Sequence, residues 1–147
     1  MSEHIYRSHN KTLLLYHLVF PVKYRKAVIT EEISETLKGI CLGISERYEL
    51  HFVEIGTDSD HVHFLVQSVP MLSLTEIIRT IKSITAKKLF ERHEELTAQL
   101  WGGNFWTSGY YANTVGKYGN EEVIKKYVES QGMEYKKIYC TQLTLFG

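Results

Sequence analysis

The first long hydrophobic segment, residues 12–24, is rich in amino acids that favour β-strands. Both alternating sets of positions within it are mostly apolar, as is typical of a central strand covered on both faces. Pro21 has no backbone N–H to donate, so pairing should weaken near the end of this segment. The pattern therefore predicts a buried strand at the start of the fold.

Two later segments have helical periodicity. From Ile33 to Tyr48, apolar residues recur at spacings of three and four, which predicts a helix with one buried face. Thr30 stands where an N-cap is needed, and acidic residues follow it in the first turn. A second helix should begin at the capping box Ser73-Leu74-Thr75-Glu76. The positions that we expect this helix to turn inward are Ile77, Ile78, Ile81, Ile84 and Leu89.

Three further strands and one more helix complete the pattern. Residues 50–56 and 61–69 predict two strands, which the turn Asp58-Ser59-Asp60 joins as a hairpin. Residues 105–115, within a stretch rich in glycine and aromatic residues, predict a fourth strand. Asn120 is a suitable cap for a final helix that Gly132 would end. The tail, residues 133–147, is rich in strand formers but is left without an assigned structure.

The predicted order of elements is β-α-β-β-α-β followed by a helix. This order is typical of the ferredoxin-like fold, which RNA-recognition modules (RRM) share: an α+β architecture with an antiparallel sheet and two helices on one face. No linker, low-complexity tract or repeat interrupts the sequence, so a single domain over residues 1–147 is expected. Because this topology serves binding modules, phosphatases and polymerases alike, it does not choose a function.

The composition indicates the cellular location of the protein more clearly than its function. The chain is 44% hydrophobic but has no apolar run near the roughly 20 residues that a membrane helix needs. Its N-terminus lacks the features of a signal peptide, so a cytoplasmic protein without membrane contact is expected. The net charge is zero, which counts against nucleic-acid binding, and solvated faces would explain the basic residues that cluster locally. The clustered residues of interest are Lys23, Arg25, Arg79, Lys82, Lys87 and Lys88.

The candidate chemistry begins with His61-Val62-His63. Side chains at positions i and i+2 of a strand point to the same side, so the two imidazoles can share one metal ion. Asp60 precedes the pair and could orient a ligating ring, although a simple turn residue is the alternative. Two buried histidines with hydrogen-bond partners would also explain the pair. If a metal is bound, two ligands are too few for a closed structural site, which favours a catalytic ion with open positions.

A second candidate pair is Tyr127 and Gln131, which are four residues apart and so lie on one face of the last predicted helix. Tyrosine can act as a covalent nucleophile, and the amide oxygen of glutamine can bind a metal ion. Both residues also belong to a stripe that could simply be the packed face of the helix. Gln131 fits that alternative poorly, because a buried amide without a partner is costly.

Together these motifs resemble the single-tyrosine HUH transposases of the insertion-sequence-200-like family. Four segments carry the resemblance in the family's order: residues 16–25, residues 58–65 around the histidine pair, residues 105–116, and residues 127–132. The resemblance therefore spans nearly the whole chain as far as Gly132. Ser59 stands where the family often has proline, which we interpret as a variation of the turn.

The resemblance implies a DNA transposase that cleaves and rejoins single-stranded DNA at element ends bearing hairpins. His61, His63 and Gln131 would hold a divalent metal ion, Mg²⁺ or Mn²⁺, and Tyr127 would attack the scissile phosphate. The attack would leave a 5′-phosphotyrosine intermediate and a free 3′-OH, so no nucleotide cofactor is needed. The resemblance also implies a homodimer with active sites shared between its subunits.

Less specific roles follow for other residues. The clustered basic residues named above are candidate contacts to the DNA backbone. Tyr24 and Trp106 could stack on bases, although packing in the core is the simpler role for Trp106. The sequence identifies no clear base for the tyrosine; Lys126 and Asp60 are candidates.

Three other interpretations stay open at this point. A domesticated relative would use the same catalytic residues on chromosomal repeat hairpins. A non-catalytic RRM-like nucleic-acid-binding module would need aromatic residues on a central strand where this chain has His61-Val62-His63. A metal-dependent hydrolase would use water as its nucleophile and would not need Tyr127.

Overall fold

The main sheet occupies the centre of the computed structural model, which describes residues 5–7, 10–12, 14–100 and 102–115. Its strands are β3 (Leu14–Pro21), β4 (His51–Asp58), β5 (His61–Ser68) and β6 (Tyr111–Val115). Their order is β4-β5-β3-β6, and each neighbouring pair is antiparallel. β3 and β5 are therefore the central strands, as the apolar pattern on both faces of the first segment predicted.

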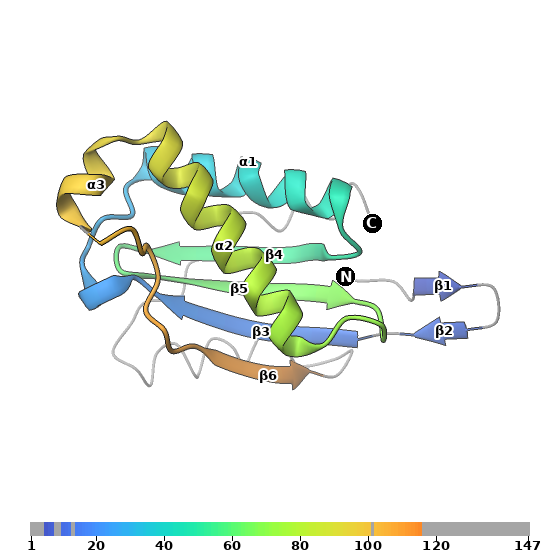
Figure 1. Ribbon diagram of the computed structural model, residues 1–147. Helices are drawn as coiled ribbons and strands as arrows, with labels where there is room; N and C mark the ends of the chain where they lie inside the picture. The colour runs from blue at the N-terminus through green and yellow to red at the C-terminus, as the bar shows by residue number, and fades with distance from the viewer. Residues whose placement is uncertain (1–4, 8–9, 13, 101, 116–147) are drawn as a thin grey trace.

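Two helices cover one face of this sheet (Figure 1). α1 (Glu31–Arg47) connects β3 to β4, and α2 (Leu74–Arg92) follows β5 and crosses the sheet diagonally. Both caps are confirmed: Thr30 Oγ1 accepts a hydrogen bond from the backbone N–H of Ile33 (3.2 Å), and Ser73 Oγ accepts one from that of Glu76 (3.1 Å). The α+β, ferredoxin-like order of elements is thereby confirmed. The final predicted helix, residues 120–132, lies outside the described residues.

Several short elements were not predicted. β1 (Ile5–Arg7) and β2 (Asn10–Thr12) are paired antiparallel and lie next to the first residues of β3 (Figure 1). A 3-10 turn, η1 (Lys23–Arg25), ends the first predicted strand earlier than expected, and a one-turn helix, α3 (Glu95–Gln99), follows α2. These elements have three to five residues each, which is too short for hydrophobic periodicity to reveal.

The fourth strand is shorter than predicted. Regular pairing with β3 begins only at Tyr111, although the sequence predicted a strand from residue 105. The Nζ of Lys82 on α2 donates hydrogen bonds to the carbonyl oxygens of Thr107 (2.8 Å), Ser108 (3.4 Å) and Gly109 (3.1 Å). These carbonyls are therefore satisfied by an ammonium group rather than by a neighbouring strand.

Apolar side chains fill the space between the helices and the sheet. Phe64 on β5 lies between Phe20 and Phe52, with ring centroids 5.2 and 5.6 Å apart. Every one of these rings is fully buried, so they form the centre of the core. The predicted inward positions of α2 that are buried are Ile77, Ile78, Ile81 and Leu89.

One inward position of α2, Ile84, packs against the core but is less buried than the others. Ile84 is only partly buried at the edge of the core, whereas its neighbour Thr85 is fully buried. The Thr85 hydroxyl donates to the carbonyl of Ile81 (2.6 Å) and accepts from the indole N–H of Trp106 (2.9 Å). A hydrogen-bonded threonine can be buried without a large penalty, and a purely hydrophobic pattern misses it.

None of the helices in the described part of the chain has the length and apolarity required to span a bilayer.

Candidate active site

His61 and His63 lie next to each other on one face of a central strand. β5 places His61 opposite Pro21 of β3 and His63 opposite Val19. Val62, between them, belongs to the hydrophobic core under the helices. The two imidazoles must therefore point to the other face of the sheet, away from α1 and α2. Both are buried, with exposed fractions of 2% and 1%.

A short chain of charged groups holds His61 in place. Asp60 Oδ1 lies 2.9 Å from His61 Nδ1, and Asp60 Oδ2 lies 3.3 Å from an Nη of Arg25. A carboxylate can only accept a hydrogen bond, so in this pair Nδ1 carries the ring proton. In the neutral ring, Nε2 of His61 then carries the lone pair, which is the arrangement found in histidines that bind metal ions.

Backbone hydrogen bonds fix the turn that carries Asp60. The carbonyl oxygen of Asp60 accepts from the N–H of Val22 (2.8 Å), and that of Ser59 accepts from the N–H of Ile29 (2.9 Å). Both donors lie in the segment that leads from β3 to α1. The β4–β5 turn is thus attached to the end of β3 and holds Asp60 close to Arg25.

Sequence reasoning did not single out a third histidine on this face. His17 of β3 is two residues before Val19, the cross-strand partner of His63, so it lies on the same side of the sheet. Its ring centroid is 6.1 Å from that of His63 and 5.7 Å from that of Tyr111 on β6. Burial lowers the pKa of His17 to about 4, so its ring is neutral at pH 7. Strand alternation, combined with the pairing of β3 and β5, identifies His17 as a member of the same face.

More polar residues share this face. Glu54 of β4 pairs with Leu65, and Gln67 lies four residues after His63 on β5. Both are buried, as is His17. A strip of buried polar side chains therefore runs over β3, β4 and β5 on the side opposite the helices. Within the described residues, no cluster of three or more His, Cys, Asp or Glu could hold a metal ion.

Two of the predicted site residues, Tyr127 and Gln131, lie outside the described residues. The structure therefore brings together His61, His63 and Asp60, and the meeting of these residues with the last helix stays a prediction.

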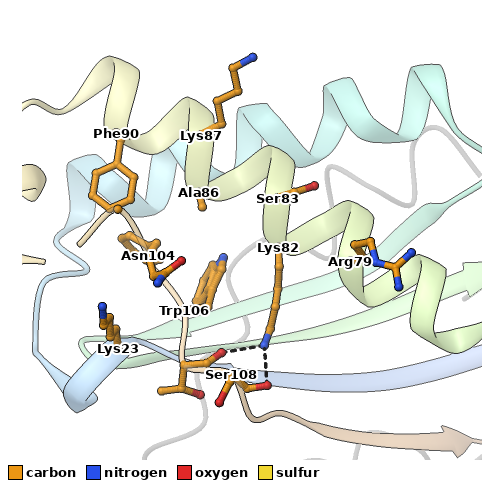
Figure 2. Close-up of a pocket in the computed structure, with 13 residues that line it drawn as sticks. Lys23, Arg79, Lys82, Ser83, Ala86, Lys87, Phe90, Asn104, Trp106 and Ser108 are labelled. Carbon is orange, nitrogen blue, oxygen red and sulfur yellow. Dashed lines mark hydrogen bonds between the residues drawn. The ribbon is translucent and has the colours of Figure 1, made fainter. Parts of the chain in front are cut away.

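The predicted DNA contacts separate into three groups. Four basic residues line one groove beside α2: Lys23, Arg79, Lys82 and Lys87 (Figure 2). Arg25 instead pairs with Asp60. Lys88 lies elsewhere, in a smaller pocket that residues of α1 and α2 line together. Trp106 is buried and packs against the rings of Phe20 and Phe105, so packing is its role in the fold.

The family model of IS200-like transposases matches residues 10–131 of the chain. The chain belongs to this transposase family. It is 34% identical over 118 residues to the ISDra2 transposase TnpA of Deinococcus radiodurans. The aligned region covers 80% of this chain and 84% of that relative. It is 29% identical over 129 residues to the transposase for insertion sequence element IS200 of Salmonella typhimurium, covering 88% and 84% of the two chains.

Solved structures agree with this assignment. A crystal structure of a Deinococcus radiodurans protein described as a transposase has a TM-score of 0.71 and 29% identity, covering 89% of this chain and 98% of that one. The REP-associated tyrosine transposase, solved with a REP hairpin, has a TM-score of 0.58 at 12% identity, covering 90% and 75%. The latter likeness concerns the fold. The IS200-like transposase is thus an enzyme of DNA transposition, as the motifs implied.

Proposed function

We propose that this transposase cleaves and rejoins single-stranded DNA at hairpin-bearing element ends, with Tyr127 as its nucleophile. The observation that carries the proposal is the histidine pair: two imidazoles side by side on one face of β5, one of them oriented by Asp60. Family membership supplies the reaction class. The tyrosine, the metal ligands and the hairpin follow from the resemblance of residues 58–65 and 127–132 to the family's motifs.

The donor set fits a divalent metal ion. His61 presents Nε2 with a free lone pair because Asp60 accepts from Nδ1, and His17 nearby is a neutral ring that adds no positive charge. Gln131 would add an amide oxygen to the two imidazoles. Mixed nitrogen and oxygen ligands suit Mn²⁺ at least as well as Mg²⁺, which prefers oxygen and water. A bound ion would neutralise charge on the scissile phosphate.

The proposed reaction conserves the phosphodiester bond energy. The phenolic oxygen of Tyr127 forms a bond to phosphorus while the bond from phosphorus to the 3′-oxygen breaks, and the 3′-oxygen leaves with a proton. The product is a 5′-phosphotyrosine and a free 3′-OH. Attack by another 3′-OH on the phosphotyrosine releases Tyr127 and reseals the strand, so no nucleotide cofactor is required.

The environment of Asp60 bears on the choice of a base for Tyr127. Its two carboxylate oxygens already contact His61 and Arg25. We therefore assign Asp60 an orienting role, which leaves Lys126 as the candidate base.

A covalent-adduct assay tests the proposal. The protein is incubated with a hairpin-bearing single strand and Mn²⁺ and then run on a denaturing gel. We expect a protein–DNA species that Tyr127→Phe abolishes and that the control Tyr135→Phe retains. Cleavage without any adduct would instead favour a hydrolase that uses water. Hairpin binding without cleavage, in Mn²⁺ or Mg²⁺, would favour a non-catalytic binding module.

Complementation tests the shared active site. We propose a homodimer in which Tyr127 of one subunit serves the histidines of the other. A His61→Ala/His63→Ala chain and a Tyr127→Phe chain would each be inactive alone, but mixing and refolding them together should restore adduct formation. If the mixture stays inactive although mixed dimers form, the tyrosine acts within its own subunit.

A further inference from the structure

A groove of about 870 Å³ lies between α2 and residues 103–108, on the helix-covered side of the sheet (Figure 2). Among the lining residues that the structure describes, four are basic, namely Lys23, Arg79, Lys82 and Lys87, and none is acidic. The chain as a whole has zero net charge, so this local excess is not a by-product of composition. A concave surface with only positive charge favours an anionic, extended ligand.

Exposed aromatic rings lie next to two of these lysines. Tyr24 is 59% exposed, and its ring centroid is 5.1 Å from Lys23 Nζ. Tyr110 is 48% exposed, and its ring centroid is 5.4 Å from Lys82 Nζ. Solvent-facing tyrosines beside backbone-binding cations are the combination with which proteins hold unpaired nucleic acids, since every base offers a face for stacking.

The turn at the edge of the groove has a strained backbone. Tyr24 and Arg25 both have positive φ, 61° and 53°, a conformation that residues other than glycine rarely adopt. This geometry directs three successive side chains to three places. Lys23 lines the groove, Tyr24 faces solvent, and Arg25 contacts Asp60, the partner of His61. Strain in this position is a sign of a functional constraint on the turn.

We infer that this groove binds an unpaired segment of the DNA substrate. Lys23, Arg79 and Lys87 contact its phosphates, and Tyr24 and Tyr110 stack on its bases. The inference deepens the proposed function, because it rests on single-stranded DNA being the substrate. The strained turn leads from the groove to the Asp60–His61 pair, so a strand that leaves the groove past Tyr24 approaches the histidine end of the sheet.

An unpaired strand fits better than a duplex. Proteins that recognise base pairs in the major groove of duplex DNA insert a protruding helix or β-ribbon into that groove. Here the basic residues line a hollow instead, and α2 forms one of its walls (Figure 2). Lys82 is the least available of the cations, because its ammonium group already bonds to the carbonyls of Thr107, Ser108 and Gly109. It supports one wall of the groove.

Salt-dependent binding tests the inference without cleavage. The full chain is titrated with a fluorescent oligo-dT of about twelve nucleotides, in EDTA, over a series of salt concentrations. Arg79→Gln/Lys87→Gln should weaken binding about tenfold or more and make the salt slope shallower by about 1.4, since each phosphate contact on a single strand contributes about 0.7. Arg92→Gln is a matched control on the same helix, because Arg92 lines the separate pocket between α1 and α2, and it should leave affinity and slope unchanged.

The tyrosines give a second, independent readout. Tyr24→Leu or Tyr110→Leu should weaken oligo-dT binding about tenfold while leaving the salt slope unchanged, because stacking releases no counterions. Equal effects of Arg79→Gln and Arg92→Gln on oligo-dT binding would overturn the inference. The inference would also be wrong if Arg79→Gln/Lys87→Gln weakened the binding of a blunt hairpin duplex but left oligo-dT binding unchanged. Adduct formation through Tyr127 at saturating DNA is measured separately, so either idea can fail without the other.

Discussion

The two faces of the sheet use polar residues for different purposes. On the face under α1 and α2, two pairs of buried polar groups bond to one another: Thr85 with Trp106 (2.9 Å) and Ser34 with Thr57 (3.1 Å). On the other face, His61 and His63 lie two residues apart on β5, and His17 of β3 lies near His63. Polar groups on the first face contribute to packing, whereas the second face carries the histidines that we propose as metal ligands.

The largest expected effects come from substitutions of two adjacent residues of β5. Phe64→Ala removes a fully buried ring under the helices, so we expect it to lower the free energy of unfolding by about 3–5 kcal/mol. His63→Gln, one residue earlier, keeps most of the side-chain volume. We expect it to reduce cleavage by roughly a hundredfold or more, because a metal ligand contributes several kcal/mol to the transition state.

Denaturant unfolding and the adduct assay, applied to both variants, check this pair. The folded fraction of Phe64→Ala should still form the adduct. A His63→Gln protein that cleaves normally would remove His63 from the metal site. A Phe64→Ala protein that folds as well as the parent would remove Phe64 from the centre of the core.

Asp60→Asn sharpens the description of the histidine face. The amide can still contact His61, but it no longer stabilises the Nδ1–H tautomer by charge, so we expect metal affinity and cleavage to fall about 10- to 100-fold. Mn²⁺ titration followed by calorimetry measures the affinity. Asp58→Asn is the comparison in the same hairpin, since Asp58 Oδ1 accepts from the N–H of Ser59 (2.7 Å). Equal losses in both variants would mean that Asp60 has no special orienting role.

Much of this comparison could be read from the sequence, because long elements carry strong periodicity. The buried strand around residues 14–21, the caps Thr30 and Ser73, and the i, i+2 geometry of His61 and His63 were all predicted. Each depends on residues near one another in the chain, where propensity and alternation are informative.

The missed features depend on contacts between distant segments. His17 approaches His63 only because β3 pairs with β5, and the fourth strand is shortened by Lys82 of α2. The groove likewise combines Lys23 with residues of α2 far along the chain. Local sequence patterns do not reveal contacts between distant segments. The sequence therefore presented His17 only as part of a strand, and the basic residues only as separate clusters.

Thr85→Val tests the claim that polar residues on the helix face serve packing. Valine fills the same space but leaves the buried indole N–H of Trp106 without an acceptor. We expect a loss of about 1–3 kcal/mol in the free energy of unfolding, the cost of an unsatisfied buried donor. Cleavage by the folded protein should be unchanged. A change in cleavage at constant stability would show that the two faces are not independent.

The smallest expected effect concerns Ser34 and Thr57, which join α1 to β4. Their hydroxyl oxygens lie 3.1 Å apart and are buried, so one hydroxyl donates a hydrogen bond and the other accepts it. Ser34→Ala should cost about 1 kcal/mol of stability, because it leaves the Thr57 hydroxyl unpaired. Adding Thr57→Val removes that orphaned group, so the double variant should lose less than the sum of the single changes. A double-mutant cycle in denaturant measures the difference. Strict additivity would mean that the pair does not interact, and polar residues under the helices would then need another explanation than mutual hydrogen bonding.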